Sequence, residues 1–216
     1  MAVSRRVVAV VLGASAVALT SCTRMIDDAR VVAAPDMGKA GATAADCTAV
    51  DAPLTSIPAK SDQEPVMKIP QPDGWERVTL MDSELIRFTM RNARLVEGGF
   101  APTAVVTLES HRGFAEPREV FNAQQDALES GIGATNVRVT ETTLCELPAE
   151  TMDYVTPRIG TLPPHPATVL TAVMHTDGTT YATTVTLQSA NPDNPTYRQD
   201  AEEILSGFQM LPPTDA

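Results

Sequence analysis

The stretch from Ala167 to Gln188 reads ATVLTAVMHTDGTTYATTVTLQ, and it decides the fold. Both halves are rich in β-branched and apolar residues, and the dipeptide Asp177-Gly178 separates them. Asp-Gly between two such runs is a strong signal for a β-hairpin, because the tight turn needs positive φ angles. We therefore predict antiparallel strands over 167–175 and 180–188. Alternation places four side chains on one face of the second strand: Tyr181, Thr183, Val185 and Leu187.

Shorter strand signals lie on both sides of this hairpin. Residues of high strand propensity predict strands over 66–69, 85–90 and 103–109, around 137–139, along Met152, Tyr154 and Thr156, and over 209–211. Prolines interrupt residues 47–60, which favours an ordered coil there over a central strand. Asp73-Gly74 predicts a turn just before the only tryptophan, Trp75.

Two helices complete the pattern. Pro117 suits the first position of a helix that should run to about Ser130, where glycines follow. Asn194 is placed to cap a second helix that has Pro195 at its first position. Strands, a helix, more strands and a closing helix predict an α+β fold, an antiparallel β-sheet covered by helices.

The N-terminal 21 residues have the features of an export signal. Arg5 and Arg6 precede a 13-residue apolar run, which is too short to span a bilayer as a stable helix. The next residues, Leu19-Thr20-Ser21-Cys22, resemble the bacterial lipoprotein signal. This resemblance implies cleavage between Ser21 and Cys22 and a diacylglyceryl group on the Cys22 thiol. The alternative is a plain secretory signal followed by a chance cysteine.

Such a lipid would place the protein outside the cytoplasm, anchored to the cell membrane. Two acyl chains suffice for stable anchoring, whereas one does not. Residues 22–46 are rich in Ala, Gly, Thr and Asp without a sustained apolar period, so we expect a flexible tether with an average reach of about 25 to 30 Å. Residues 47–216 then form a single domain, whose length suits one hydrophobic core.

The charge of the chain excludes some partners. The 216 residues include 16 basic and 27 acidic side chains, a net charge of −11. Residues 1–21 contain Arg5 and Arg6 but no acid, so their removal leaves 14 basic residues and a net charge of −13. This sign is wrong for binding nucleic acid or anionic lipid headgroups. The sequence has no coiled-coil heptads, and we expect a monomer.

Two cysteines remain once Cys22 is assigned to the lipid. Outside the cytoplasm, the pair Cys47 and Cys145 is most simply a disulfide. The alternative is two free buried thiols. The bridge would close a loop of nearly 100 residues, for which chain entropy predicts a stabilisation of roughly 4 to 5 kcal/mol.

We find no pattern typical of catalysis, of metal binding or of a cofactor. Gly-x-Ser-x-Gly, paired histidines, Cys-x-x-Cys and calcium loops are all absent from the sequence. The three histidines stand beside no convincing nucleophile: His111, His165 and His175. Two acid pairs, Asp82 with Glu84 and Glu141 with Glu146, could be imagined as glycosidase carboxylates, but solvated acids are the simpler interpretation.

Binding is the remaining class of function. Two loops are candidate lips of a cleft, residues 98–100 and the proline-rich loop 160–166, although both could be simple connections. The candidate ligand-binding residues are Trp75, Phe100 and Leu162. A lone tryptophan is more often a core or rim residue than a ligand platform.

Several strings in their order resemble the LpqN-type (LpqN/LpqT) family of mycobacterial lipoproteins. They are the lipoprotein signal at Cys22, Cys47 with Ala52-Pro53-Leu54, Glu64-Pro65, Ile69-Pro70, Gly74-Trp75, Gly99-Phe100, Ala104-Val105-Val106-Thr107-Leu108 and Leu144-Cys145. The match covers residues 47–150 well and the remainder by pattern only. The resemblance implies a PsbP-like α-β-α layered domain, and only the three cysteines transfer position by position.

The resemblance also implies a role in envelope biogenesis, with members that handle trehalose-based mycolate lipids through partner proteins. We therefore expect a non-catalytic binding or adaptor module for an amphiphilic glycolipid or an envelope protein. The alternatives are an enzyme that processes envelope sugars or esters with unrecognised carboxylates, and a purely structural surface protein.

Overall fold

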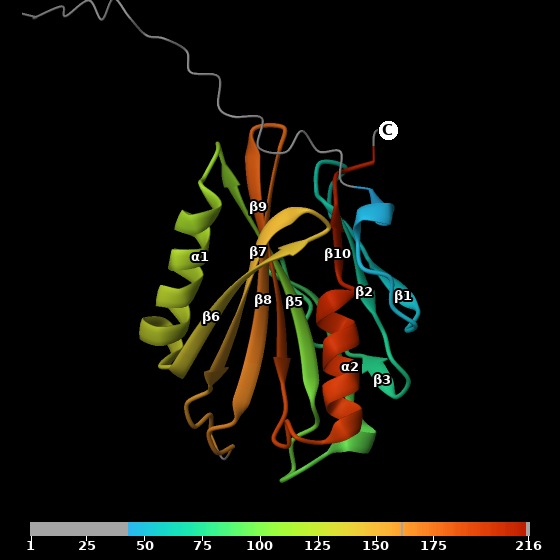
Figure 1. The fold of residues 1–216 in the computed structure, drawn as a ribbon, viewed down its shortest axis with the longest axis vertical. Helices are drawn as coiled ribbons and strands as arrows, with labels where there is room; N and C mark the ends of the chain where they lie inside the picture. Colours follow the sequence, from blue (N-terminus) through green and yellow to red (C-terminus); the bar gives the residue numbers. More distant parts are fainter. Residues whose placement is uncertain (1–42, 161, 215–216) are drawn as a thin grey trace, which may run out of the picture. The chain divides into compact units, whose positions relative to one another are not determined.

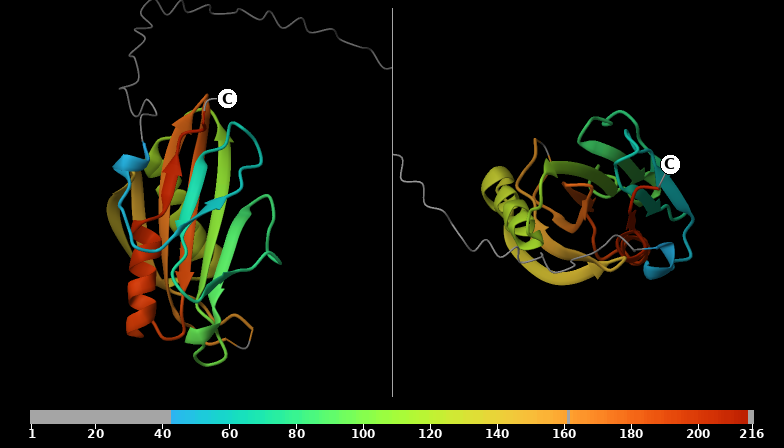
Figure 2. Two further views of the ribbon diagram at one scale, coloured as in Figure 1. Left: turned by 90° about the vertical axis from the view of Figure 1, so that its right-hand side faces the viewer. Right: turned by 90° about the horizontal axis from the view of Figure 1, so that it is seen from above.

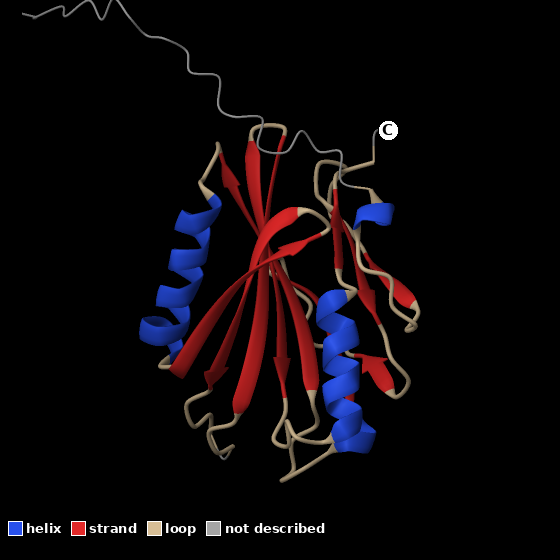
Figure 3. Cartoon of the chain, in the orientation of Figure 1, coloured by secondary structure: helices blue, strands red, loops and turns tan. Residues whose placement is uncertain are grey.

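The computed structural model describes residues 43–160 and 162–214, and strands dominate this part of the chain (Figures 1 and 3). Seven antiparallel strands form a large sheet in the order β3-β4-β5-β9-β8-β7-β6. They are β3 (Trp75–Arg77), β4 (Ile86–Asn92), β5 (Thr103–Arg112), β6 (Thr135–Leu144), β7 (Leu147–Val155), β8 (Pro166–Thr176) and β9 (Thr179–Gln188). A smaller sheet has the order β1-β2-β10, with β1 (Leu54–Ile57), β2 (Val66–Pro70) and β10 (Gln209–Leu211).

Two longer helices accompany these sheets. Helix α1 (Pro117–Asp126) continues as a π-helix over Ala127–Ile132, and α2 spans Pro195–Ser206. Short 3-10 helices span Ala44–Asp46 and Ala93–Leu95. Gly133 ends the π-helix with a φ of 78°, a left-handed conformation that glycine adopts without strain. The predicted helix from Pro117 to about Ser130 is thus present, but its last turns are π-helical.

The hairpin that opened the sequence analysis lies at the centre of the large sheet. Thr176 pairs with Thr179, and the two residues between them have positive φ angles, 50° for Asp177 and 72° for Gly178. These angles are what a two-residue β-hairpin turn requires. The prediction of two antiparallel strands is confirmed.

The large sheet has a core on each face. On one face it packs against α2 and the small sheet, through residues that include Leu170, Val185, Leu187, Ile204 and Phe208. On the other face, Leu128 of the π-helix packs against a smaller cluster that contains Met152, Tyr154 and Val169. Seen from above in Figure 2, α1 lies on one side of the large sheet, and α2 and β1 lie on the other. The predicted α+β fold with a layered α-β-α arrangement is therefore observed.

Two local predictions need correction. The expected coil over 47–60 contains strand β1, because Pro53 and Pro58 only border the four residues that pair with β2. The predicted turn at Asp73-Gly74 is present, with a Gly74 φ of 87°, but it leads directly into strand β3, which the sequence did not predict. Both strands lie at a sheet edge, where one missing partner strand lets prolines and short segments fit.

Cys47 and Cys145 form a disulfide with an S–S distance of 2.00 Å, in agreement with the expected pairing. It joins the segment before β1 to the tight turn between β6 and β7. The predicted signal over 1–21, the Ser21-Cys22 cleavage site and most of the tether over 22–46 lie outside the described residues. Within the part that is described, no helix is long and apolar enough to cross a membrane.

Candidate functional site

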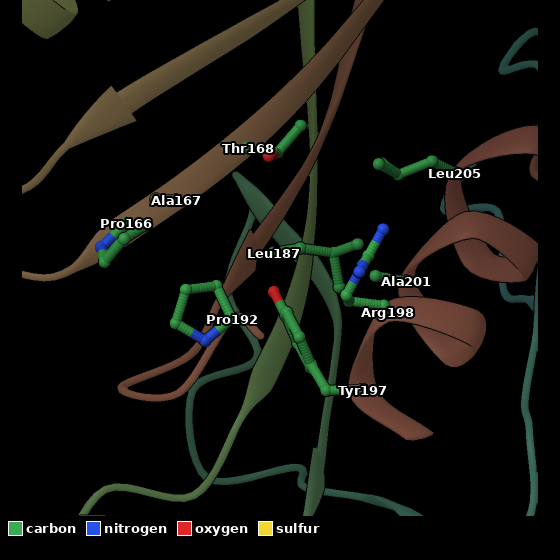
Figure 4. A pocket seen from close by; sticks show the side chains of 9 residues that line it. All are labelled: Pro166, Ala167, Thr168, Leu187, Pro192, Tyr197, Arg198, Ala201 and Leu205. Atoms are coloured by element: carbon green, nitrogen blue, oxygen red, sulfur yellow. The ribbon is translucent and has the colours of Figure 1, made fainter. Parts of the chain in front are cut away.

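An open groove of about 220 Å³ lies between helix α2 and the β8–β9 hairpin (Figure 4). Most of its lining is apolar, and no acidic residue, serine, histidine or cysteine lines it. The lining residues are Pro166, Ala167, Thr168, Leu187, Pro192, Tyr197, Arg198, Ala201 and Leu205. The groove is the candidate functional site.

Local sequence signals position both walls of the groove. The hairpin register places Thr168 directly opposite Leu187, so these two side chains share the face that meets α2. On the other wall, Tyr197, Ala201 and Leu205 recur every four residues and therefore lie along one face of the helix. The side-chain oxygen of Asn194 accepts hydrogen bonds from the backbone N–H groups of residues 196 and 197, at 3.0 and 3.2 Å, and fixes the start of this helix.

Tyr197 is the most buried polar side chain of the groove. Only 7% of the residue is exposed, and burial raises the pKa of its hydroxyl far above the usual value. Within residues 43–160 and 162–214 this hydroxyl has no hydrogen-bond partner, and Figure 4 shows its oxygen pointing into the groove. The phenol thus presents a donor to the open groove.

Arg198 supplies the only formal charge among the lining residues. It is exposed, and none of the ion pairs in the described part of the chain involves it. Thr168, on the opposite wall, donates its hydroxyl hydrogen to a carboxylate oxygen of Asp153 at 2.6 Å. Asp153 itself is on β7, outside the lining.

The candidate residues from the sequence lie away from this groove. Trp75 is 3% exposed, and its indole N–H donates to the carboxylate of Asp200 at 2.8 Å, so it is a core residue as the alternative interpretation held. Phe100 and Leu162 are both half-buried at one end of the large sheet. The structure does not place any of these three in the groove lining.

The two loops proposed as lips do meet. The Phe100 ring lies 4.9 Å from the ring of His165, measured between centroids. His165 is 5% exposed, and its Nε2 lies 3.0 Å from the side-chain oxygen of Gln188 on β9. This histidine therefore fixes the proline-rich loop to the sheet, and the same loop leads into Pro166 at the groove wall.

Three of the four acids considered as carboxylate pairs are engaged in ion pairs. Arg77 binds Asp82 at 2.7 Å, Lys60 binds Glu84 at 2.6 Å, and Arg118 binds Glu141 at 2.5 Å. No group of three or more metal-binding side chains occurs among the residues that the structure describes.

Two buried acids escaped the sequence analysis. Glu150 is 6% exposed, and burial raises its pKa, partly offset by nearby Arg118 and reinforced by nearby Glu141. Burial likewise raises the pKa of Asp200, against the opposing hydrogen bonds from Trp75 and Asn92. Solvated acids are so common in this chain that no local signal distinguished these two.

The helical spacing of Tyr197, Ala201 and Leu205 predicts an apolar face of the second helix, but it does not identify these residues as part of a site. The residues that follow in the groove, Arg198 and Thr168, carry no motif. Their proximity depends on how α2 lies across the hairpin, so no spacing in the sequence could have shown it.

Comparisons with known proteins support the fold. No family model matches the sequence, and no curated protein matches it. The crystal structure of LpqN, described as involved in cell envelope biogenesis of Mycobacterium tuberculosis, is similar with a TM-score of 0.59 and 16% identity, covering 74% of this chain and 91% of that one.

Two further structures have lower scores. The Ran-binding protein Mog1p of Saccharomyces cerevisiae matches with a TM-score of 0.44 and 13% identity, over 74% of this chain and 97% of its own. The PsbP protein CyanoP of Synechocystis matches with a TM-score of 0.42 and 14% identity, over 76% of this chain and 96% of its own. The chain therefore has an α+β fold similar to that of LpqN.

Proposed function

We propose that this chain is a cell-envelope lipoprotein of the LpqN type that acts as a non-catalytic binding module. Cleavage before Cys22 and acylation of that residue would hold the domain outside the cytoplasm on a tether. The lipoprotein signal in the sequence and the structural likeness to LpqN, a protein of envelope biogenesis, support this proposal.

The groove beside α2 is the observation on which the binding role depends. Most of its lining residues are apolar, no carboxylate, histidine, serine or cysteine is among them, and the Thr168 hydroxyl is engaged with Asp153, which favours binding over hydrolysis or group transfer. Its volume of about 220 Å³ is below the range of roughly 300–1,000 Å³ that is usual for small-molecule sites. It can therefore accommodate one end of an amphiphilic glycolipid or a side chain of an envelope protein, and the rest of the partner would lie outside.

The anchor and the groove need separate tests. For the anchor, the mass of the N-terminal peptide and detergent partitioning would be measured for the wild-type protein and Cys22→Ala, expressed in a bacterium that processes lipoproteins. We expect an acylated Cys22 peptide and detergent-phase protein only for the wild type. An unacylated wild-type protein in the aqueous phase would refute the anchor.

For the groove, native mass spectrometry would follow the binding of a trehalose monoester to the chain that begins at Thr23. Ala201→Phe places a large side chain in the groove, whereas Gln199→Phe places the same side chain on the exposed face of α2. We expect Ala201→Phe to abolish binding and Gln199→Phe to leave it unchanged. Equal binding by both variants would refute the groove as the site.

A further inference from the structure

We propose that the groove prefers ligands in which an apolar chain ends in a carboxylate, and that Tyr197 and Arg198 bind this head group. The inference depends on the proposed function, because it names the chemistry of the ligand that the same groove would take. It goes beyond binding of a neutral sugar ester, because it assigns the groove a preference for an anionic head group.

Tyr197 provides the first argument. Its hydroxyl is held in a site where only 7% of the residue is exposed, and no described residue accepts its hydrogen. The ring is buried while the hydroxyl faces the open groove, so this donor is free to form a hydrogen bond with a ligand oxygen. A tyrosine hydroxyl is protonated at neutral pH, and burial raises its pKa further, so it can donate to a ligand oxygen.

Arg198 provides the second argument. The protein has a net charge of −11, yet the groove is lined by one cation and no acid. A guanidinium group that is not engaged in an ion pair can bind both oxygens of a carboxylate, in the strong charge-assisted geometry. Both residues line the groove from α2, and in Figure 4 the Tyr197 oxygen points toward the strands while the Arg198 side chain runs along the helix beside Ala201.

The remaining lining suits the chain of such a ligand. Leu187, Ala201 and Leu205 are apolar and line the groove between the two donors and Thr168. At the Thr168 end, the hydroxyl hydrogen is already donated to Asp153, so this wall offers an anion neither a donor nor a favourable charge. The carboxylate is therefore expected at the Tyr197 and Arg198 side.

Calorimetric titration of the chain from Thr23 with decanoate, and with decanol as the uncharged probe, tests this preference. We expect decanoate to bind at least about tenfold more tightly than decanol. Arg198→Gln should weaken decanoate binding about tenfold or more, and Tyr197→Phe about threefold to tenfold, because each removes a hydrogen bond to the carboxylate. Decanol affinity should not change in Arg198→Gln.

Arg112→Gln is the matched control, because Arg112 is also exposed and is outside the groove. It should leave both affinities unchanged. Equal affinity for decanoate and decanol, no binding of decanoate, or an Arg198→Gln variant that binds decanoate like wild type would overturn the inference. If a trehalose monoester still bound and Ala201→Phe still blocked it, the proposed function would stand while this inference would fail.

Discussion

Removal of the Cys47–Cys145 disulfide should destabilise the domain strongly, and the structure gives the size of the effect. The two cysteines are separated by 98 positions, and the chain-entropy relation gives about 4.7 kcal/mol for closing a loop of this length in the unfolded state. Native disulfides usually contribute about 2–5 kcal/mol. We therefore expect the double variant Cys47→Ala/Cys145→Ala to lose about 3–5 kcal/mol of unfolding free energy.

Urea unfolding at pH 7 would measure this loss in the chain that begins at Thr23. Trp75 is the only tryptophan and lies in the main core, so its fluorescence reports the unfolding of that core. The matched control is Asp46→Ala, which removes only the exposed hydrogen bonds to Thr43 beside the bridge. This control should change stability by less than about 1 kcal/mol, as is usual for surface substitutions.

A typical domain has only about 5–15 kcal/mol of unfolding free energy, so the double variant should be close to marginal stability. The reasoning assumes that the bridge acts by restricting the unfolded chain. The double variant would refute it by losing less than about 1 kcal/mol of unfolding free energy while the slope of unfolding free energy against urea concentration stays unchanged.

Three further predictions concern buried acids and a turn. Folding raises the pKa of Asp200, so the contribution of this residue to stability is complete below its unfolded pKa and is lost as the pH rises through its folded pKa. Asp200→Asn should therefore raise the melting temperature at pH 7 but not at pH 3. A lower melting temperature of the variant at pH 7 would contradict this. Folding also raises the pKa of Glu150, so Glu150→Gln should stabilise the domain at pH 7, whereas the exposed control Glu146→Gln should not. Chemical denaturation measures the unfolding free energy of both variants. Equal effects of the two substitutions would argue against burial as the cause. Gly74 has a φ of 87°, and a Cβ at this position would approach the Asn92 side chain to 3.1 Å. Gly74→Ala should therefore lower the unfolding free energy, measured in urea, by about 1–2 kcal/mol. An unchanged unfolding free energy would show that the turn relaxes freely.

The sequence predicted those parts of the fold that short-range chemistry determines. Asp177-Gly178 defined the central hairpin, and Asn194 with Pro195 defined the start of α2, because each signal acts within a few residues. Loops 98–100 and 160–166, the candidate lips of a cleft, lie side by side, with the Phe100 and His165 rings in contact. Thr103 and Ala167 both pair with Gln188, so the loops before them end at the same edge of the sheet.

Long-range packing determined the features that the sequence left open or did not show. Trp75 lies in β3, which pairs with β4, and its indole N–H donates a hydrogen bond to Asp200, 125 positions away. The groove combines the second helix with residues of the hairpin, and its key property is a tyrosine hydroxyl that has no partner among the described residues. Neither fact has a signature in composition or spacing.

The central claim is that this domain binds an envelope amphiphile through the groove beside α2. The most direct measurement is an amide chemical-shift map of the ¹⁵N-labelled chain from Thr23, titrated with a trehalose monoester. The account predicts that shifts concentrate on Thr168, Leu187 and residues 197–205. Shifts confined to α1, or no shifts at high ligand concentration, would contradict it.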